Sequence, residues 1–417
     1  MLPLYFIIIF LSSFVLSDIG VLPILNVGMS LYLVDVIYLY FFTCFGVTWI
    51  STKYPLKDVS KWFLALLGAL IFSILYGTTK FGFSAFGEGR YIAWIFFFSV
   101  PLYFYFSKEI QTIKDIDRFF KHTYTIVAVS ILVLLCIEII NGGRYFFVET
   151  NQEFAQLEDG RGVRYLGSEE TFNLGVVVIF AIISLFMSKR KDFLQICFIL
   201  LLTAIIFFTK NRTAIISLFL SLIIVLFSEG KAKLVWKFLL FFVTLAGVFF
   251  LMFPKVAESV ITPITNIVNI TEDETGNWRL LLQAVAIEQG MQTPIFGQGF
   301  GGYYSYYIES MGMTIEYPPH SIYVLLFQKG GIFVLGIYII ALLMLIKECT
   351  KLKKYTIQYP VAEKYRLLFK VLFVAQIPYG FAYNFSIYFG LYIGLFIILK
   401  KVIHKRISEQ NLINGTI

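Results

Sequence analysis

Charged side chains are scarce in this chain of 417 residues. Asp, Glu, Lys and Arg together make up 14% of it, whereas soluble domains carry roughly 25%, and hydrophobic residues make up 59%. A soluble globular protein of this size could not cover its surface with so few polar side chains. The composition therefore excludes the soluble, disordered, coiled-coil and disulfide-scaffold classes.

Cysteine and histidine are also rare, and no metal or nucleotide motif is present. The four cysteines lie in or beside apolar runs, with no CxxC pair and no histidine at ligand spacing, so we expect small buried hydrophobes: Cys44, Cys136, Cys197 and Cys349. The sequence contains no HExxH, no paired acidic metal motif and no GxxxxGK[ST]. We therefore expect no metal, no cofactor and no ATP-driven transport.

Long hydrophobic runs dominate what is present. A bilayer-spanning helix needs roughly 20 apolar residues, and these runs are continuous rather than alternating, which indicates helices and not a barrel. We expect an all-α integral membrane protein, a single polytopic domain over 1–417 with about 12 transmembrane helices. The predicted spans are 2–17, 31–50, 61–77, 91–106, 124–140, 171–188, 192–209, 212–228, 234–253, 331–347, 366–383 and 385–400.

The first run, Met1 to Ser17, resembles a signal peptide in its apolar segment but lacks a basic start, since the first basic residue is Lys53. We favour an uncleaved first span.

The distribution of basic residues predicts the orientation. Alternate loops hold 24 of the 34 Lys and Arg residues on one side and the remaining 10 on the other. The richer side is predicted to be cytoplasmic, with both termini inside and residues 401–417 as a cytoplasmic tail. Anionic lipid head groups account for the net charge of +8, so no nucleic-acid partner is implied.

Two outer loops are long, 141–170 and 254–330. In the second, Asn277 to Gln289 has apolar residues at helical spacing and precedes Gly290, which indicates a short amphipathic helix. A turn-rich PIFGQGFGG follows, then Pro318-Pro319 and a second short helical pattern, HSIYVLLFQK. Its GxGxxG match lacks the strand of a dinucleotide fingerprint, so we expect a tight turn close to a ligand or lipid head group.

Basic residues on the predicted outer side are candidate phosphate ligands. Arg212 lies between two spans, two residues after Lys210, where a guanidinium could bind a phosphate through paired hydrogen bonds or serve as an interface anchor. Arg279, on the predicted outer helix, is either a ligand or part of a solvated face. Arg161 and Arg164 are either ligands or ordinary surface charge.

His320 precedes the second short helix. A helix N-terminus disfavours the imidazolium, and a neutral imidazole near pH 7 can accept a proton, so the position suits a general base. A polar residue that merely starts the helix is the alternative.

Three stretches in this order resemble the O-antigen polymerase and O-antigen ligase superfamily: KNRTAIISL, WRLLLQAVAIEQGMQTPIFGQGFGGY and PPHSIYVLLFQKGGIFVLG. The resemblance implies a GT-C-like, metal-independent, inverting glycosyltransferase that acts on the outer face of the bacterial cytoplasmic membrane. Its donor would be a glycan linked to undecaprenyl pyrophosphate. By resemblance, Arg212, Arg279 and His320 are catalytic, and the substrate contacts are Lys210, Arg161, Arg164 and Tyr303.

The resemblance favours a polymerase of lipid-linked polysaccharide repeats, with a chain-length regulator and a flippase as further partners. An O-antigen ligase that transfers glycan to lipid A-core is the first alternative. A lipid-linked oligosaccharide flippase or other transporter is the second, although transporters place charged sites at the midplane rather than at the outer boundary.

Overall fold

The computed structural model describes residues 23–26, 30–32, 43, 59–90, 110–140, 168–187, 193–208, 212–252, 274–302, 306–308, 313–315, 318–383 and 388–413. The predicted spans 2–17 and 91–106 and nearly all of the first outer loop lie outside these ranges. So does most of the predicted span 31–50, whose first two residues belong to a strand rather than a helix.

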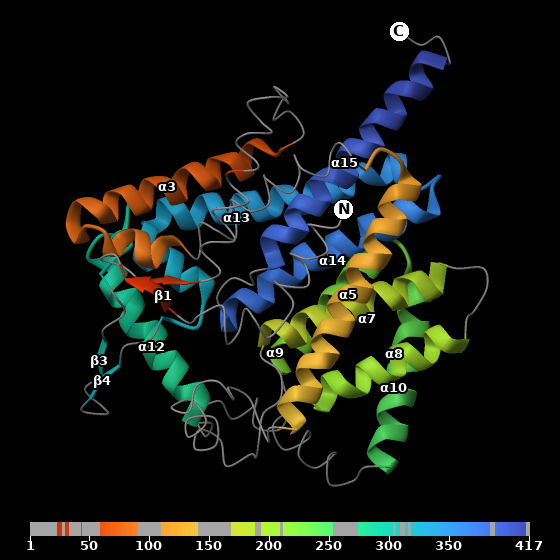
Figure 1. Cartoon of the computed structure of the whole chain (residues 1–417), viewed down its shortest axis with the longest axis horizontal. Helices are drawn as coiled ribbons and strands as arrows, with labels where there is room; N and C mark the ends of the chain where they lie inside the picture. The colour runs from red at the N-terminus through yellow and green to blue at the C-terminus, as the bar shows by residue number, and fades with distance from the viewer. Residues whose placement is uncertain are drawn as a thin grey trace.

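The described part is a helical bundle with two small hairpins (Figure 1). The helices are α3 (Lys61–Phe81), α5 (Ile113–Ile140), α7 (Ser168–Met187), α8 (Phe193–Phe208), α9 (Arg212–Ser228), α10 (Ala232–Met252), α12 (Glu274–Met291), α13 (Ile322–Thr356), α14 (Pro360–Ala382) and α15 (Tyr388–Ile413). Strand β1 (Pro23–Asn26) pairs antiparallel with β2 (Ser30–Tyr32), and β3 (Tyr306–Ile308) with β4 (Met313–Ile315). The described part is thus mainly helical, as the all-α prediction expects, with the two short hairpins in addition.

Four described helices are long and apolar enough to cross a membrane: α3, α5, α7 from Glu170 to Met187, and α13. The segments Phe193–Ile206 and Thr213–Ser228 are shorter apolar helices. These helices fit a multi-pass membrane protein, and the expected twelve spans stay a prediction.

The centre of the bundle is formed by α7 and α14, which are buried on nearly every side. Helix α14 packs against α13, α9, α7, α15 and α5. Aromatic rings join α5, α7 and α14, with ring centroids 4.4 Å apart for Phe120–Tyr365 and 4.5 Å apart for Tyr124–Phe180. Such contacts stabilise packing beyond the apolar area that they bury.

The outer helices turn apolar side chains outward. On α10, Trp236 and Leu251 are 67% and 85% exposed, as expected of a surface that faces lipid. The prediction of buried cysteines is correct for Cys349 and wrong for Cys136 and Cys197, which are exposed on α5 and α8. Lipid-facing positions are as apolar as core positions, so an apolar neighbourhood does not predict burial in such a bundle. Cys44 lies outside the described residues.

The glycine-rich turn 294–302 packs between α3 and α13. Backbone N–H groups of Gln298 and Gly299 each donate to α13, to the carbonyls of Gln328 and Lys329, at 2.9 Å. Helix α13 is broken there by Gly331, at φ 63° and ψ −168°. The predicted short helix 320–329 and span 331–347 are therefore two parts of one kinked element.

The glycines in this turn serve close backbone packing. An added Cβ would lie 2.6 Å from the Cα of Gly77 if built on Gly299, and 2.1 Å from the carbonyl oxygen of Phe300 if built on Gly77. The buried Lys329 pairs with Glu88 at 2.8 Å, and Glu88 also accepts the N–H of Gly301. The expected tight turn is thus present, with its glycines in close packing, and a ligand or lipid head group beside it stays a prediction.

A buried ionic network, which we call the Arg366 network, joins the α9–α10 turn to α13 and α14. The guanidinium of Arg366 is fully buried and forms paired contacts with Glu229, at 2.9 and 3.2 Å, and with Glu363, at 2.7 Å twice. Lys353 and Lys370 also pair with Glu229. Burial opposes ionisation of Glu229, but hydrogen bonds from Arg366 and Lys370 outweigh it and lower its pKa to about 2.

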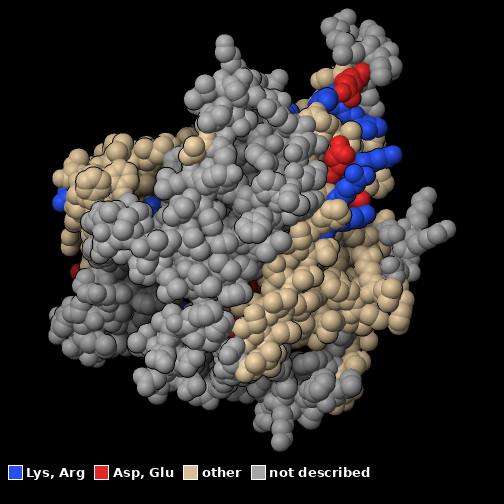
Figure 2. Space-filling model, in the orientation of Figure 1, with Lys and Arg blue, Asp and Glu red and all other residues tan. Residues whose placement is uncertain are grey.

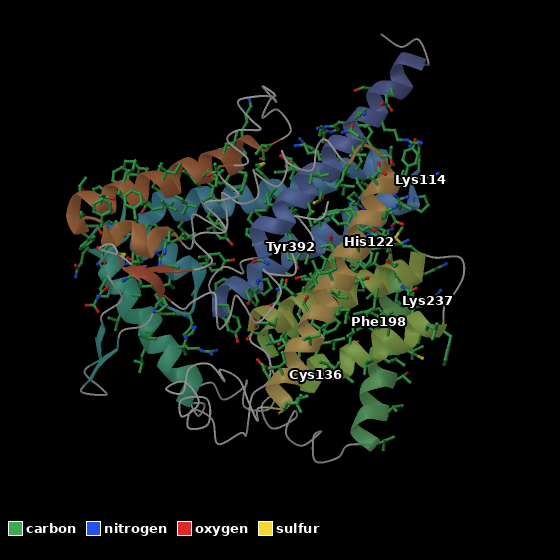
Figure 3. The ribbon with its side chains drawn as sticks, viewed as in Figure 1. Lys114, His122, Cys136, Phe198, Lys237 and Tyr392 are labelled. Carbon is green, nitrogen blue, oxygen red and sulfur yellow. The ribbon has the colours of Figure 1, made fainter. Side chains whose placement is uncertain are left out.

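Charged residues gather at one end of the molecule. Figure 2 shows Lys and Arg mixed with Asp and Glu at that end, and Figure 3 places Lys114 and His122 there, on the first turns of α5, with Cys136 at the opposite end of the same helix. The ion pairs at the charged end include Lys400–Glu348, at 3.0 Å. We call this end of the bundle the basic end.

Candidate functional site

The structure describes two of the predicted site residues in full. Arg279 lies in the first half of α12, and His320 lies two residues before α13 begins. Arg212 is the first residue of α9, but its side chain is outside the description. The predicted substrate contacts Arg161, Arg164, Lys210 and Tyr303 also lie outside the described residues.

Arg279 and His320 come together because α12 packs against α13. Gln283, one turn after Arg279 on α12, donates its side-chain N–H to the carbonyl oxygens of His320, at 3.3 Å, and Phe381, at 3.4 Å. A single amide thus ties α12 to the start of α13 and to the end of α14.

The end of α14 holds the backbone beside His320. The hydroxyl of Ser321 donates to the carbonyl of Gly380 at 3.1 Å, and the N–H of Ile322 donates to the carbonyl of Tyr383 at 3.2 Å. The Tyr383 ring lies below the guanidinium of Arg279, whose Cζ is 5.7 Å from the ring centroid. This contact orients the cation without neutralising it.

The electrostatics of the pair favour an uncharged imidazole beside a fixed cation. Burial, reinforced by the charge of Arg279, lowers the pKa of His320 to about 4. The buried Nε of Arg279 has no hydrogen-bond partner among the described residues. A buried donor of this kind is well placed for an anionic ligand, because an unmade hydrogen bond is costly.

Within the described ranges, no group of three or more His, Cys, Asp or Glu residues could hold a metal ion. The arrangement that the structure does provide can bind an anion through arginine and accept a proton at a neutral imidazole in the same place.

Comparison with known families gives a match over the part of the chain that contains Arg279 and His320. Residues 196–339 match a family model described as O-antigen ligase. We call this matched region, about a third of the chain, the O-antigen ligase domain. No curated protein matches the chain.

The O-antigen ligase domain reaches from within α8 to within α13, so it contains Arg212, Arg279, the glycine-rich turn and His320. The superfamily resemblance inferred from the three sequence stretches is therefore confirmed. The family covers ligases and polymerases, which are glycosyltransferase-like enzymes.

Sequence reasoning missed three residues that build the site: Gln283, Ser321 and Tyr383. Gln283 could have been found, because it lies four residues after Arg279 and so on the same helical face. Tyr383 carries no local signal, since it reaches the site through the packing of α14, which lies outside the O-antigen ligase domain.

Proposed function

We propose that this protein polymerises lipid-linked glycan repeats by moving a growing glycan from undecaprenyl pyrophosphate to a hydroxyl of an incoming lipid-linked repeat. One observation carries the proposal: a cationic guanidinium and an uncharged imidazole share one site within an O-antigen ligase domain. A guanidinium stabilises the charge of a diphosphate leaving group, and an uncharged imidazole accepts the proton of an attacking hydroxyl.

The reaction divides between these two side chains. The acceptor oxygen forms a bond to the anomeric carbon on the face opposite the carrier, and the bond from that carbon to the pyrophosphate oxygen breaks with inversion. His320 takes the hydroxyl proton, and the electron pair of the broken bond stays on the pyrophosphate. Arg279, joined by Arg212 from α9, stabilises the charge of this leaving group.

Substrate binding would also adjust the base. Arg279 is one of the two causes that lower the pKa of His320. A pyrophosphate paired with Arg279 offsets that positive charge, so the pKa of the imidazole rises when the donor is bound. The imidazole is therefore uncharged in the empty site and becomes a stronger base in the occupied one.

The test is a glycan gel on cells that carry single variants. Arg279→Ala and His320→Ala should each abolish long-chain product while the protein still reaches the membrane. Arg406→Ala and His404→Ala, on the exposed end of α15, are the matched controls and should keep full chain length. Long-chain product in both site variants would contradict the assignment.

The ligase is the second candidate, and the matched family is described as O-antigen ligase although it covers polymerases as well. Deletion of the gene separates the two activities. Loss of a polymerase leaves a single repeat on the final acceptor, whereas loss of a ligase leaves nothing attached and full-length glycan on the carrier.

We place the protein in the bacterial cytoplasmic membrane, with both termini inside and the Arg279–His320 site on the outer face. A transporter would need two compartments, so purified protein in detergent should extend lipid-linked repeats only if it is an enzyme. No extension by well-folded protein would favour the flippase.

A further inference from the structure

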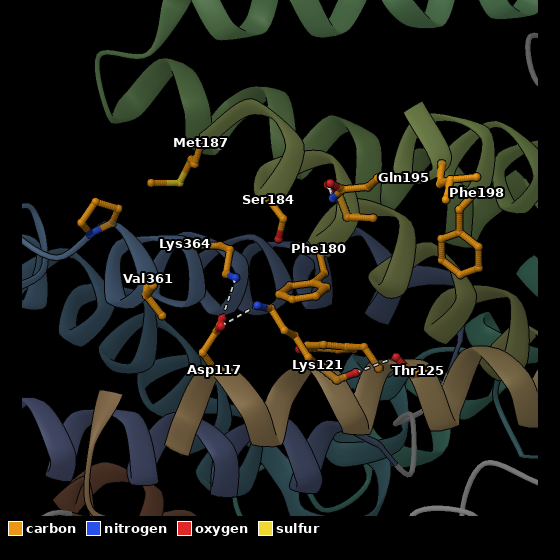
Figure 4. A pocket seen from close by; sticks show the side chains of 14 residues that line it. Asp117, Lys121, Thr125, Phe180, Ser184, Met187, Gln195, Phe198, Val361 and Lys364 are labelled. Carbon is orange, nitrogen blue, oxygen red and sulfur yellow. Dashed lines mark hydrogen bonds and ion pairs between the residues drawn. The ribbon is translucent and has the colours of Figure 1, made fainter. Parts of the chain in front are cut away.

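A groove at the basic end lies beside the start of α14, whereas the Arg279–His320 site lies beside the end of that helix. It has a volume of about 710 Å³ and lies between α5, α7, α8 and the start of α14 (Figure 4). A second hollow of about 400 Å³ adjoins it and shares three lining residues, Asp117, Lys121 and Val361. We call the two together the basic groove.

Charge in the basic groove is mostly positive. Four cations line it, against the single carboxylate of Asp117: Lys114, Arg118, Lys121 and Lys364. Asp117 accepts ion pairs from Lys121, at 2.6 Å, and Lys364, at 2.9 Å, so one anion is shared by two lysines. Asp115 is the other acid on this stretch of α5, and it is engaged by Thr112. An excess of positive charge remains, and it favours an anionic ligand.

Two hydroxyls inside the groove have no hydrogen-bond partner among the described residues. Tyr124 is 3% exposed, and its hydroxyl oxygen is buried and lacks such a partner. The Oγ of Ser184 is likewise buried and lacks such a partner. Both residues line the groove, and Figure 4 shows Ser184 pointing into it. Buried hydroxyls without partners are costly, so they indicate a ligand with oxygen atoms.

The remaining wall is apolar and opens on the surface that faces lipid. Leu194 and Phe198 of α8 line the groove and are 75% and 38% exposed, whereas Lys121 at the polar side has a side chain 59% exposed. A ligand in this groove would have an anionic head beside lysine, oxygen atoms near Tyr124 and Ser184, and an apolar tail along α8.

We propose that the basic groove binds one anionic phospholipid of the membrane leaflet at the basic end. Its phosphate pairs with Lys114, Arg118 and Lys121, its glycerol ester oxygens accept hydrogen bonds from Tyr124 and Ser184, and one acyl chain lies against Leu194 and Phe198. The leaflet that basic residues face is the one that carries anionic lipid. This lipid is distinct from the glycan carrier, whose site the proposed function assigns to the opposite end of α13.

The test uses the full chain, purified in detergent and stripped of lipid, with native mass spectrometry after addition of phosphatidylglycerol or phosphatidylcholine. Wild-type protein should retain one phosphatidylglycerol with clear preference over phosphatidylcholine. The preference should weaken as salt is raised, because the head-group contacts are partly exposed. Equal retention of the two lipids, or a preference that salt does not change, would overturn the proposal.

Variants locate the site. Lys114→Ala/Arg118→Ala should weaken phosphatidylglycerol binding about tenfold or more, since each basic side chain near an anionic surface contributes several-fold. Lys351→Ala/Lys354→Ala removes the same charge from exposed positions on α13 and should leave binding unchanged. An equal loss in both double variants would mean general charge attraction and would contradict a built site.

Tyr124→Phe distinguishes a ligand contact from a structural role. Because it removes a hydroxyl without a partner, it should leave the lipid-free protein as thermally stable as wild type or more so. The stabilisation gained on adding phosphatidylglycerol should become smaller. An undiminished gain would contradict a contact between the Tyr124 hydroxyl and the lipid. Binding of inorganic phosphate in place of phosphatidylglycerol would contradict a lipid site and show a simple anion site.

Discussion

At the scale of single residues, His320 lies beside the cation Arg279 and carries an uncharged imidazole that can accept a proton. Its charge state depends on burial and on Arg279, and both depress its pKa. The sequence argument expected a neutral imidazole from the helix terminus alone, and the structure supplies these two further causes.

A titration follows from the depressed pKa. In a His122→Gln/His404→Gln background, the labelled imidazole of His320 should stay uncharged from pH 8 to about pH 5, with a midpoint near 4, by nuclear magnetic resonance. Arg279→Gln should raise the midpoint, although not to 6.5, because burial remains. A midpoint at 6.5 in the unmodified site would show that His320 is solvated.

The same shift predicts the sign of a stability change. The folded pKa of His320, about 4, lies below the ordinary value of 6.5, so the folded state binds fewer protons between these values. The contribution of this pKa shift to the free energy of unfolding is fully present above pH 6.5 and is lost as the pH falls toward 4.

Local pattern predicted Arg279 and His320, because each stands at a recognisable helix signal. It could not predict Tyr383 or Ser321 as their supports, because those contacts depend on where α14 ends in space. The role of Lys329 was also out of reach, since its partner Glu88 lies 241 positions earlier in the numbering.

At the scale of elements, the crossing of α3, the glycine-rich turn and the kink of α13 decides where α12 can lie. The turn connects directly to the end of α12, so its fit against α3 fixes the helix that carries Arg279. Backbone approaches this close leave no room for a side chain.

Two glycines of α3 provide a matched comparison. Gly77→Ala should destabilise the protein by about 1–3 kcal/mol, because its Cβ would overlap the carbonyl of Phe300. Gly68→Ala meets nothing within 4 Å and should be neutral or stabilising by up to about 1 kcal/mol, since alanine favours helix. Thermal unfolding in detergent measures both, and equal effects would contradict the close packing.

Element boundaries show where the sequence argument was weakest. The predicted span 124–140 is the last part of α5, which begins at Ile113, and 331–347 is the middle of α13, which runs to Thr356. In both helices the omitted turns at the basic end carry charged residues. Hydropathy marks the part of a helix inside lipid and not the turns that continue beyond it.

At the scale of the whole molecule, α13 separates two chemically different ends. His320 precedes its first residue and Lys353 lies in its last turn. The part of α13 after the break at Gly331 spans roughly 38 Å, more than the roughly 30 Å hydrocarbon layer, so we expect the two ends on opposite sides of a bilayer.

Cysteine labelling tests the orientation. In a background with the native cysteines replaced by serine, Gln292→Cys, on the exposed turn after α12, should react with a membrane-impermeant maleimide in intact spheroplasts. Lys351→Cys should react only after the membrane is permeabilised. The reverse pattern would invert the predicted topology, and labelling of both in intact spheroplasts would contradict a spanning α13.

The Arg366 network has a consequence for the order in which the protein can be completed. Glu229 is synthesised 137 positions before Arg366, so the ribosome delivers the carboxylate long before the guanidinium that matches it. During that interval the α9–α10 hairpin is present without its closing partner, and burying Glu229 then would leave an uncompensated charge. The final docking of this hairpin therefore waits until α14 has been translated. The later part of the chain thus completes the packing of helices that were made much earlier.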